Sequence, residues 1–368
     1  MMGIFKQIEV TIRKVITAVS NYSLYILKTS NQYKLSDKKK YAIINLDGQF
    51  LNYDMGRFSY ILSKYCENAG FNISIKTDRN YFKRISTYKK PLLQQEYLFL
   101  KKSSTPLNSI VFITADQVQK SIYLEYGYDV TKNTLYDCVA AFPLHPEYYK
   151  SYPSEEMFEK LRKSPRRMRI FFAGNTNPQK YQKDQLMKLF AVNNRVDLLN
   201  YLINKYSQNN LLETIYDKQQ LYHLLDHDKK EIKPFVISEV KSNSDDWLKI
   251  LSNSNFFLCA TGVYMPWCHN LSESMAVGTI PILEYAHLCA PPLVHMENCL
   301  TFSGLNNVEK TIELALALDQ ENIARLKNNV IRYYEYNLSP ESIVKKIKDL
   351  MALPHPDLTV AVPYIPKA

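Results

Sequence analysis

Short apolar runs alternate with amphipathic stretches along most of the chain. Buried strands are predicted at 41–47, 72–78, 109–116, 168–173, 235–240, 255–262 and 279–285. Helical spacing of apolar residues is found at 58–71, 183–206, 211–225, 269–278, 308–319, 320–336 and 339–351. This alternation is typical of parallel sheets with helices on both faces, so the predicted fold class is α/β.

The chain has 368 residues, 46% of them hydrophobic and 22% charged, which is more than one compact core usually holds. A charged stretch that ends in Ser164-Pro165-Arg166-Arg167 is taken as the domain boundary. Four parts are therefore expected: an N-terminal helix and linker, two doubly wound domains that face a cleft, and a crossover helix with a tail. Their predicted bounds are 1–40, 41–163, 164–338 and 339–368.

Residues 4–27 have the spacing of an amphipathic helix. Its apolar positions are Phe5, Ile8, Ile12, Val15, Ile16 and Val19, and the basic residues Lys6, Arg13 and Lys14 lie among them. Two interpretations stay open: a helix packed on the protein body, and a basic helix lying on an anionic membrane surface. The run is too mixed for a signal peptide, and no stretch of about 18 apolar residues predicts a spanning helix.

The net charge of +10 favours a negatively charged partner, such as a phosphate-bearing ligand, a nucleic acid or an anionic membrane. The sequence has no zinc-finger, RRM or Gly/Arg-rich signature, so a nucleic-acid partner is disfavoured. The six cysteines include no CxxC pair, and reduced thiols in the cytoplasm are expected.

Glycine is scarce, with nine in the whole chain, and three of the nine follow predicted strands. These three are Gly48, Gly174 and Gly262. Open parallel sheets bind ligands beyond the carboxyl ends of their strands, where loops and helix N-termini present N–H groups that suit phosphate. None of the three belongs to a GxGxxG or GxxxxGK[ST] motif, which disfavours a Rossmann dehydrogenase and a P-loop NTPase.

The segment 256–283 joins a buried strand, the Gly262 loop and a helix with several polar residues near its start. These polar residues are His269, Asn270, Ser272 and Glu273. The N-terminus of this helix would favour a diphosphate, and the Glu273 carboxylate could accept hydrogen bonds from ribose or sugar hydroxyls.

This segment resembles the donor-binding region of GT-B glycosyltransferases, near the exostosin-like branch. The run Ser272-Glu273-Ser274-Met275-Ala276-Val277-Gly278-Thr279-Ile280-Pro281 carries the resemblance, and FFAGNTNPQKY and LKNNVIRYYEYNLSPES support it. The likeness is specific over about 165–345 and only architectural over 41–160. It implies transfer of a sugar from a UDP- or GDP-linked donor to a hydroxyl of a glycan or lipid-linked acceptor.

The resemblance also implies which residues hold the donor. The growing charge of the nucleoside diphosphate needs N–H groups or cations beside it. Gly174, Asn175 and Thr176 would supply them from one loop. The other donor-binding candidates are Gly262, His269, Asn270, Ser272 and Glu273, with Lys180 and Lys241 as candidate cations.

Many retaining members of this class have two glutamates separated by seven residues. Counting back eight positions from Glu273 reaches Met265, so an inverting mechanism is favoured. Such a mechanism needs a base that removes the acceptor proton, and the base is expected from the N-terminal domain. The candidates at or after predicted strand ends are Asp47, Asp54, Asp116 and His145.

No catalytic metal is expected. The motif Asp226-His227-Asp228 has the letters of a metal-binding DxD, but it follows a predicted helix and not a strand. Two alternatives stay open: a nucleotide-sugar epimerase of the same fold, and a non-catalytic protein that binds an anionic surface. The expected location is the cytoplasm, with peripheral attachment to the inner membrane face.

Overall fold

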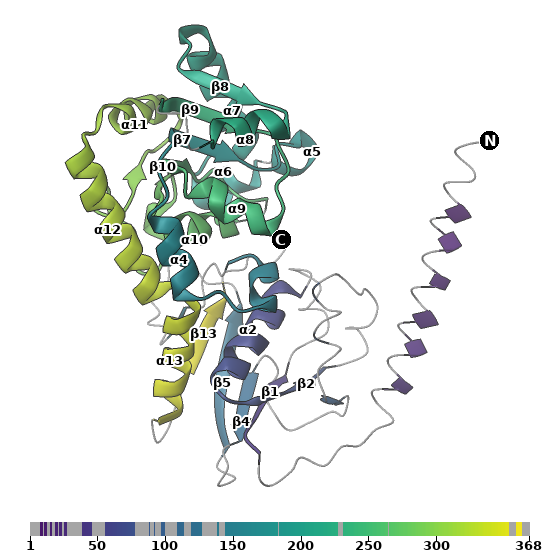
Figure 1. Ribbon diagram of the computed structural model, residues 1–368. Helices are drawn as coiled ribbons and strands as arrows, with labels where there is room; N and C mark the ends of the chain where they lie inside the picture. Colours follow the sequence, from purple (N-terminus) through teal and green to yellow (C-terminus); the bar gives the residue numbers. More distant parts are fainter. Residues whose placement is uncertain are drawn as a thin grey trace. The chain divides into compact units, whose positions relative to one another are not determined.

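The structure is a computed structural model in which the chain folds into two compact units (Figure 1). Unit 1 comprises residues 1–125, 135–139 and 343–362, and unit 2 comprises residues 126–134, 140–342 and 363–368. The described residues are 8–9, 11–12, 15–16, 19–20, 22–23, 26–27, 39–45, 56–77, 88, 92, 97–99, 109–113, 119–126, 138–139, 144–182, 184–226, 231–263, 265–352 and 358–362.

Unit 1 contains a seven-stranded mixed sheet of order β3-β2-β1-β4-β5-β13-β6. Its strands are β1 (Tyr41–Asn45), β2 (Asn72–Lys76), β3 (Tyr97–Phe99), β4 (Ser109–Ile113), β5 (Gln119–Tyr126), β6 (Cys138–Val139) and β13 (Leu358–Val362). The sheet is not wholly parallel as the sequence predicted, because β4 runs antiparallel to both β1 and β5. Only residues 114–118 join β4 to β5, and a parallel pair would need a crossover of a dozen or more residues.

The strand, helix and strand predicted at 41–47, 58–71 and 72–78 are confirmed as a βαβ unit. Helix α2 (Arg57–Asn68) joins β1 to β2, which pair in parallel. Gly56 and Gly70 flank the helix with φ angles of 82° and 96°, values that an L side chain rarely adopts. Tyr60, Ile61 and Cys66 of α2 are buried, which makes this helix the cover of the unit 1 core.

Unit 2 contains six strands that all run parallel, in the order β12-β11-β10-β7-β9-β8. They are β7 (Met168–Ala173), β8 (Leu212–Ile215), β9 (Lys233–Ser238), β10 (Ser254–Leu258), β11 (Ile280–Leu283) and β12 (Leu300–Thr301). Every residue of β10 and β11 is buried, which explains why these strands are continuous apolar runs. The doubly wound α/β fold predicted for this part of the chain is confirmed.

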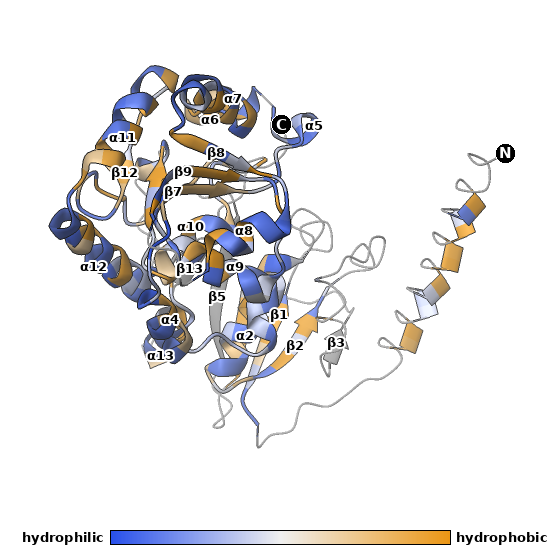
Figure 2. Ribbon diagram, turned by 45° about the horizontal axis from the view of Figure 1, so that its top comes forward, coloured by the Kyte–Doolittle hydropathy of each residue, from blue (hydrophilic) through white to orange (hydrophobic). Residues whose placement is uncertain are grey.

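Helices lie on both faces of this sheet. The helices of unit 2 are α4 (Glu155–Arg162), α5 (Pro178–Tyr181), α6 (Gln185–Phe190), α7 (Arg195–Tyr206), α8 (Lys218–Leu224), α9 (Ser244–Leu251), α10 (His269–Ala276), α11 (Leu305–Ala317) and α12 (Gln320–Asn337). Helices α6, α7 and α11 lie on one face and α8, α9 and α10 on the other, with hydrophobic strands between them (Figure 2). Three short 3-10 helices, η3 (Pro146–Lys150), η4 (Ser207–Asn209) and η5 (Ala286–Leu288), join these elements.

The expected domain boundary at 163/164 differs from the division in the structure, where unit 2 already includes residue 140. The charged segment that ends at Arg167 is therefore part of unit 2 and not a boundary. The Arg166 guanidinium donates to the carbonyl oxygens of Ser252 (2.6 Å), Ser254 (2.8 Å), Val277 (3.2 Å) and Gly278 (3.2 Å). Its charge therefore stabilises carbonyl groups at the ends of α9 and α10 and at the start of β10, and burial lowers the pKa of Arg166 to about 10.

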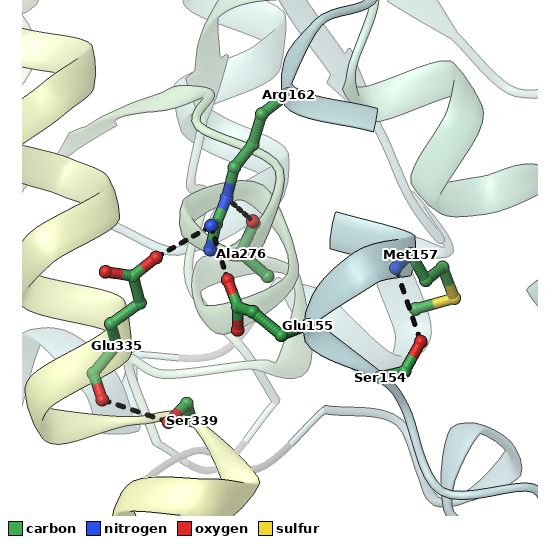
Figure 3. A network of polar contacts seen from close by, with 7 residues as sticks. All are labelled: Ser154, Glu155, Met157, Arg162, Ala276, Glu335 and Ser339. Carbon is green, nitrogen blue, oxygen red and sulfur yellow. Dashed lines mark hydrogen bonds and ion pairs between the residues drawn. The ribbon is translucent and has the colours of Figure 1, made fainter. Parts of the chain in front are cut away.

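Arg162 has a similar role in the same segment (Figure 3). Its Nε donates to the Ala276 carbonyl at the end of α10 at 2.9 Å. Its Nη1 forms ion pairs with Glu155 at 2.6 Å and Glu335 at 2.7 Å. One buried guanidinium thus joins α4, α10 and α12 within unit 2.

Two predicted helices differ from the structure. The segment 211–225 begins with strand β8, because Leu212 and Ile215 are buried and β8 pairs with β9. Helix α8 starts only at Lys218, where the Asp217 side chain accepts a hydrogen bond from Gln220 N. The segment 183–206 is divided into α6 and α7 by residues 191–194, with Ala191 at a φ of 54°.

The two ends of the chain contain helical residues as predicted. Helix α13 (Pro340–Ala352) begins in unit 2, and residues 343–362 belong to unit 1. The described positions between 8 and 27 are helical, and Ile8, Ile12 and Ile16 are 50%, 52% and 62% exposed. Within the described parts of the chain, no helix is both long and apolar enough to cross a membrane.

Candidate functional site

The order of the strands in unit 2 reverses at β7, which lies between β9 and β10. In open α/β sheets, such a reversal leaves a crevice beyond the carboxyl ends of the strands. A pocket of about 1280 Å³ lies there. It is lined by His145, Glu147, Tyr148, 173–180, 239–244, Trp247, His269, Asn270 and Glu273, all of which belong to unit 2.

The loop after β7 forms one wall of the pocket. Asn175 Oδ1 accepts a hydrogen bond from Asn177 N, and Asn177 Oδ1 accepts one from Gln179 N, both at 2.9 Å. Two consecutive Asx turns therefore hold the loop in one conformation and begin α5 at Pro178. Lys180 lies in α5 and is exposed, so its ammonium group can reach a ligand in the pocket.

Gly174 and Gly262 are required by packing within the protein. A Cβ at Gly174 would lie 3.1 Å from Arg195 Nη1 and 3.3 Å from Phe172 Cζ. A Cβ at Gly262 would lie 2.6 Å from the Met265 oxygen and 2.8 Å from the Trp267 oxygen. Both glycines thus allow close packing of the chain, and Gly262 does not line the pocket.

The N-terminus of α10 forms a second wall. The helix starts at His269, and its N-cap residue Cys268 makes no side-chain capping bond. Asn270 Nδ2 donates to the Ala173 carbonyl at 3.4 Å, which links α10 to the end of β7. The positive end of the helix dipole therefore lies beside the Gly174 loop, a combination that favours an anion.

Glu273 lies in the second turn of α10 and is only 2% exposed, yet it lines the pocket. Its Oε1 accepts from the His145 backbone N at 3.0 Å, and its Oε2 accepts from Trp247 Nε1 at 2.6 Å. Burial raises the pKa of Glu273 to about 7, although the bonds from Trp247 and His145 act to lower it. Near neutral pH the carboxyl group therefore exists in both protonation states.

Trp247 of α9 is fixed by other aromatic residues of unit 2. Its ring centroid lies 6.3 Å from that of Phe171 and 6.0 Å from that of Phe257. The indole N–H is thereby held toward Glu273 by contacts to β7 and β10. This contact joins two helices that are adjacent to the pocket.

His145 belongs to unit 2 and not to the N-terminal domain in which the sequence analysis placed it. Its ring centroid lies 5.5 Å from that of His269, with the two rings at 75°. His145 Nδ1 accepts a hydrogen bond from Glu147 N at 3.4 Å. Tyr148 Oη donates to the Ser244 carbonyl at 2.7 Å, which anchors the 145–150 segment beside α9.

The structure brings most of the candidate donor-binding residues to one pocket. Those that line it are Gly174, Asn175, Thr176, His269, Asn270 and Glu273, together with His145, Lys180 and Lys241. Gly262 lies outside the lining, and Ser272 is fully buried in α10. Asp47, Asp54 and Asp116 lie outside the described residues, so their roles stay predictions.

Sequence reasoning missed Trp247, Tyr148 and Arg195. The sequence gives no signal for Trp247, because nothing local connects an indole to a carboxylate 26 positions away. Arg195 carries one available signal: it is a cation in the first turn of a helix, where the dipole disfavours it. A cation at such a position is expected to be held by groups that do not belong to the helix.

Among the described residues, no group of three or more His, Cys, Asp or Glu side chains could hold a metal ion. Asp226 follows helix α8, which confirms that the Asp226-His227-Asp228 motif comes after a helix. His227 and Asp228 themselves lie outside the described residues.

Fold and pocket define unit 2 as a doubly wound α/β domain with a polar pocket at its topological switch point. No protein-family model matches the sequence, and no curated protein matches it.

Solved structures resemble the chain only distantly. A glycosyltransferase from Rickettsia africae shares 9% identity over 84% of this chain and 96% of its own, with a TM-score of 0.45. Anabaena HepE in complex with UDP and glucose shares 10% identity over 84% of this chain and 99% of its own, with a TM-score of 0.41. The trehalose-6-phosphate synthase OtsA shares 15% identity over 92% of this chain and 76% of its own, with a TM-score of 0.38. At these values the likeness assigns no function to individual residues.

Proposed function

We propose that the chain is a glycosyltransferase that moves a sugar from a UDP- or GDP-linked donor to a hydroxyl of a glycan or lipid-linked acceptor. The observation that carries the proposal is the placement of Glu273. This buried carboxyl lines a pocket that also contains the Gly174 loop and the N-terminus of α10. A nucleoside diphosphate needs both features, because its phosphates require positive groups and its ribose hydroxyls require acceptors.

The diphosphate is proposed to lie between the Gly174–Thr176 loop and the start of α10, with Lys180 and Lys241 as nearby cations. The ribose would donate hydrogen bonds to Glu273. A carboxylate has about four acceptor sites, and the bonds from His145 N and Trp247 Nε1 use two of them. Glu273 therefore keeps acceptor capacity toward the pocket.

Departure of the nucleoside diphosphate is proposed to be assisted by His145 and His269. Because His145 Nδ1 accepts the Glu147 N–H, a neutral His145 ring has its proton on Nε2. In that form the ring is a donor that suits an anionic leaving group, and it is poorly suited to remove the acceptor proton at Nε2. The catalytic base of an inverting reaction is therefore proposed among Asp47, Asp54 and Asp116.

Three finer proposals rest on the sequence. Membership of the exostosin-like branch rests on the run from Ser272 to Pro281, and inversion rests on Met265 where retaining relatives have a glutamate. Independence of a metal rests on the lack of a DxD after an apolar strand.

Peripheral attachment to the cytoplasmic membrane face is proposed through residues 4–27. The apolar spacing of Ile8, Ile12 and Ile16 supports it, since a stripe of this kind can lie in the membrane interface. Lys6, Arg13 and Lys14 would add attraction to anionic lipids.

The test is a thermal-shift screen of the full chain with UDP-, GDP-, CMP- and TDP-sugars, followed by product analysis with and without glycan acceptors. The proposal would be supported if sugars linked to one of these nucleotides stabilise the chain and sugar is transferred only when an acceptor is present. Conversion of the donor to an isomeric nucleotide-sugar without acceptor would indicate an epimerase. Absence of any nucleotide effect on stability would contradict both.

A further inference from the structure

Arg195 occupies an unusual position beneath the pocket. It is the first residue of α7 and is 4% exposed. Its guanidinium donates to three backbone carbonyls: Nε to Thr261 at 2.9 Å, Nη1 to Asn175 at 3.1 Å and Nη2 to Ala260 at 3.4 Å. One side chain therefore joins the loops that follow β7 and β10, the two strands at the topological switch point.

No carboxylate of the described part of the chain forms an ion pair with Arg195. The guanidinium lies over the Tyr181 ring at 4.2 Å and 5.9 Å from the Phe172 centroid. Carbonyl dipoles and aromatic faces stabilise a cation without cancelling its net charge. The result is a buried positive charge in a region of low dielectric, where its field is weakly screened.

The charge lies directly behind the pocket wall. Gly174 and Asn175 line the pocket, and a Cβ on Gly174 would lie 3.1 Å from Arg195 Nη1. Arg195 itself does not line the pocket. A single layer of backbone thus separates the guanidinium from the ligand space.

The contact with Asn175 also fixes the direction of the next peptide N–H. In a trans peptide the C=O and the following N–H point in opposite directions. Because the Asn175 carbonyl points to Arg195, the Thr176 N–H points away from Arg195. Thr176 lines the pocket, and its N–H makes no hydrogen bond to any described residue.

We propose that Arg195 is the positioning residue that makes the Gly174–Thr176 loop selective for a diphosphate. It holds the Asn175 carbonyl away from the phosphates, orients the Thr176 N–H, and supplies an unneutralised positive charge behind the loop. Gly174 is required because a Cβ would push the guanidinium from this position. This inference rests on the proposed nucleotide-sugar function of the same pocket.

The test compares the affinities of UDP, UMP and uridine by calorimetry on the full chain, with the guanosine set in parallel. In Arg195→Met, we expect diphosphate affinity to fall about 30-fold and nucleoside affinity to change less than about threefold. A purely structural role would weaken all three ligands together, so the ratio of diphosphate to nucleoside affinity is the decisive quantity.

Arg169 supplies a matched control. Its guanidinium also binds three backbone carbonyls, those of Ala315, Leu316 and Leu318, and it lies 5.9 Å from the Phe256 ring centroid. It does not line the pocket, and neither do these four partners. Arg169→Met should lower the melting temperature and leave the affinity ratio unchanged.

A second variant keeps the proposal testable should Arg195→Met fail to fold. Gly174→Ala retains the charge but displaces the guanidinium, and we expect the ratio to fall about threefold to tenfold. If the ratio of diphosphate to nucleoside affinity is unchanged in the folded variants, or falls equally in Arg169→Met, the role of Arg195 is overturned. The proposed function is not affected by that result. Failure of the wild-type chain to bind any of the six ligands would overturn the proposed function as well.

Discussion

The indole N–H of Trp247 donates a 2.6 Å hydrogen bond to Oε2 of Glu273. This contact joins α9 to α10 at the pocket, and the His145 backbone N–H supplies the second donor to the same carboxyl group. Both donors are neutral, so neither supplies the opposite charge that would hold a buried carboxylate ionised. Desolvation is therefore the larger effect, and the pKa of Glu273 is raised to about 7.

The first prediction concerns stability and pH. The pKa of Glu273 rises from a usual 4.5 to about 7 on folding, so the folded state binds more protons between these values. The contribution of Glu273 to the free energy of unfolding is therefore full below about pH 4.5 and falls as the pH rises to about 7, by roughly 2–3 kcal/mol. Urea unfolding at a series of pH values should show this slope, and Glu273→Gln should remove it.

Two tryptophan variants identify the source of the slope. Trp247→Phe removes a donor that lowers the pKa of Glu273, so the loss of stability should extend to higher pH. Trp267→Phe removes the other indole, which packs on Phe190 and is not among the groups that shift the pKa of Glu273, and should leave the midpoint unchanged. A shared response of both variants would contradict the assignment to Glu273.

The second prediction concerns donor affinity. Glu273→Gln should weaken binding of the nucleotide-sugar by about 1–3 kcal/mol, the scale of a hydrogen bond to a charged group. Glu284→Gln is the control, since Glu284 is another buried carboxylate, bound by Asn193 and Gly304 and outside the pocket. Calorimetry should show a loss of affinity in the first variant only. Equal affinity of Glu273→Gln and wild type would remove Glu273 from the donor site.

The third prediction concerns the network in Figure 3. Arg162→Met removes the bond to the Ala276 carbonyl and both ion pairs, and should lower the free energy of unfolding by about 2–4 kcal/mol. Glu155 and Glu335 remain 41% and 42% exposed at their side chains, so water limits the loss. The exposed Lys160 in the same helix is the control, and Lys160→Met should change stability by less than about 0.5 kcal/mol.

The fourth prediction concerns metals. Sugar transfer should continue at its full rate in EDTA, because the positive groups proposed around the diphosphate belong to the protein: Lys180, Lys241 and the α10 N-terminus. Rates are compared in EDTA, and in EDTA followed by excess Mg²⁺ or Mn²⁺. Activity that disappears in EDTA and returns with either ion would refute metal independence.

The fifth prediction concerns residues 1–30. A chain without them should stay folded and bind donor, but should no longer sediment with phosphatidylglycerol-containing vesicles. Two full-length variants separate the contributions: Ile12→Glu/Ile16→Glu removes the apolar stripe, and Lys6→Gln/Arg13→Gln/Lys14→Gln removes the charge. The charge variant should lose its preference for anionic over neutral vesicles. Unchanged sedimentation of the truncated chain, or its aggregation, would favour a helix packed on the body.

Much of the fold could be predicted because it depends on local pattern. The buried strands β7, β9, β10 and β11 are apolar runs, and α12 was placed to within a residue by its 3.6-residue period. Strand β8 was missed because Leu212 and Ile215 fit a helical or an extended pattern equally well. Its pairing with β9, which comes some 20 residues later, decides between the two.

The domain boundary predicted at 163/164 was wrong because it was placed at a run of charged residues. A run that contains Arg162, Arg166 and Arg167 has the composition of a solvated linker, yet all three side chains are largely buried in unit 2. The carbonyl groups that bind Arg162 and Arg166 come from residues more than 80 positions away. Composition cannot show such partners, because burial of a charge depends on what the fold brings near it.

The sequence by itself determined the α/β class, the parallel sheet of unit 2, and the polar residues that follow its strands. Only the tertiary structure decided that His145, the 173–180 loop, the 239–244 loop, Trp247 and Glu273 line one pocket. The same holds for the buried environment of Glu273 and the charge of Arg195 behind the loop. The reason is physical: strand order brings distant segments to one sheet edge, and burial and hydrogen-bond partners there set the properties of each group.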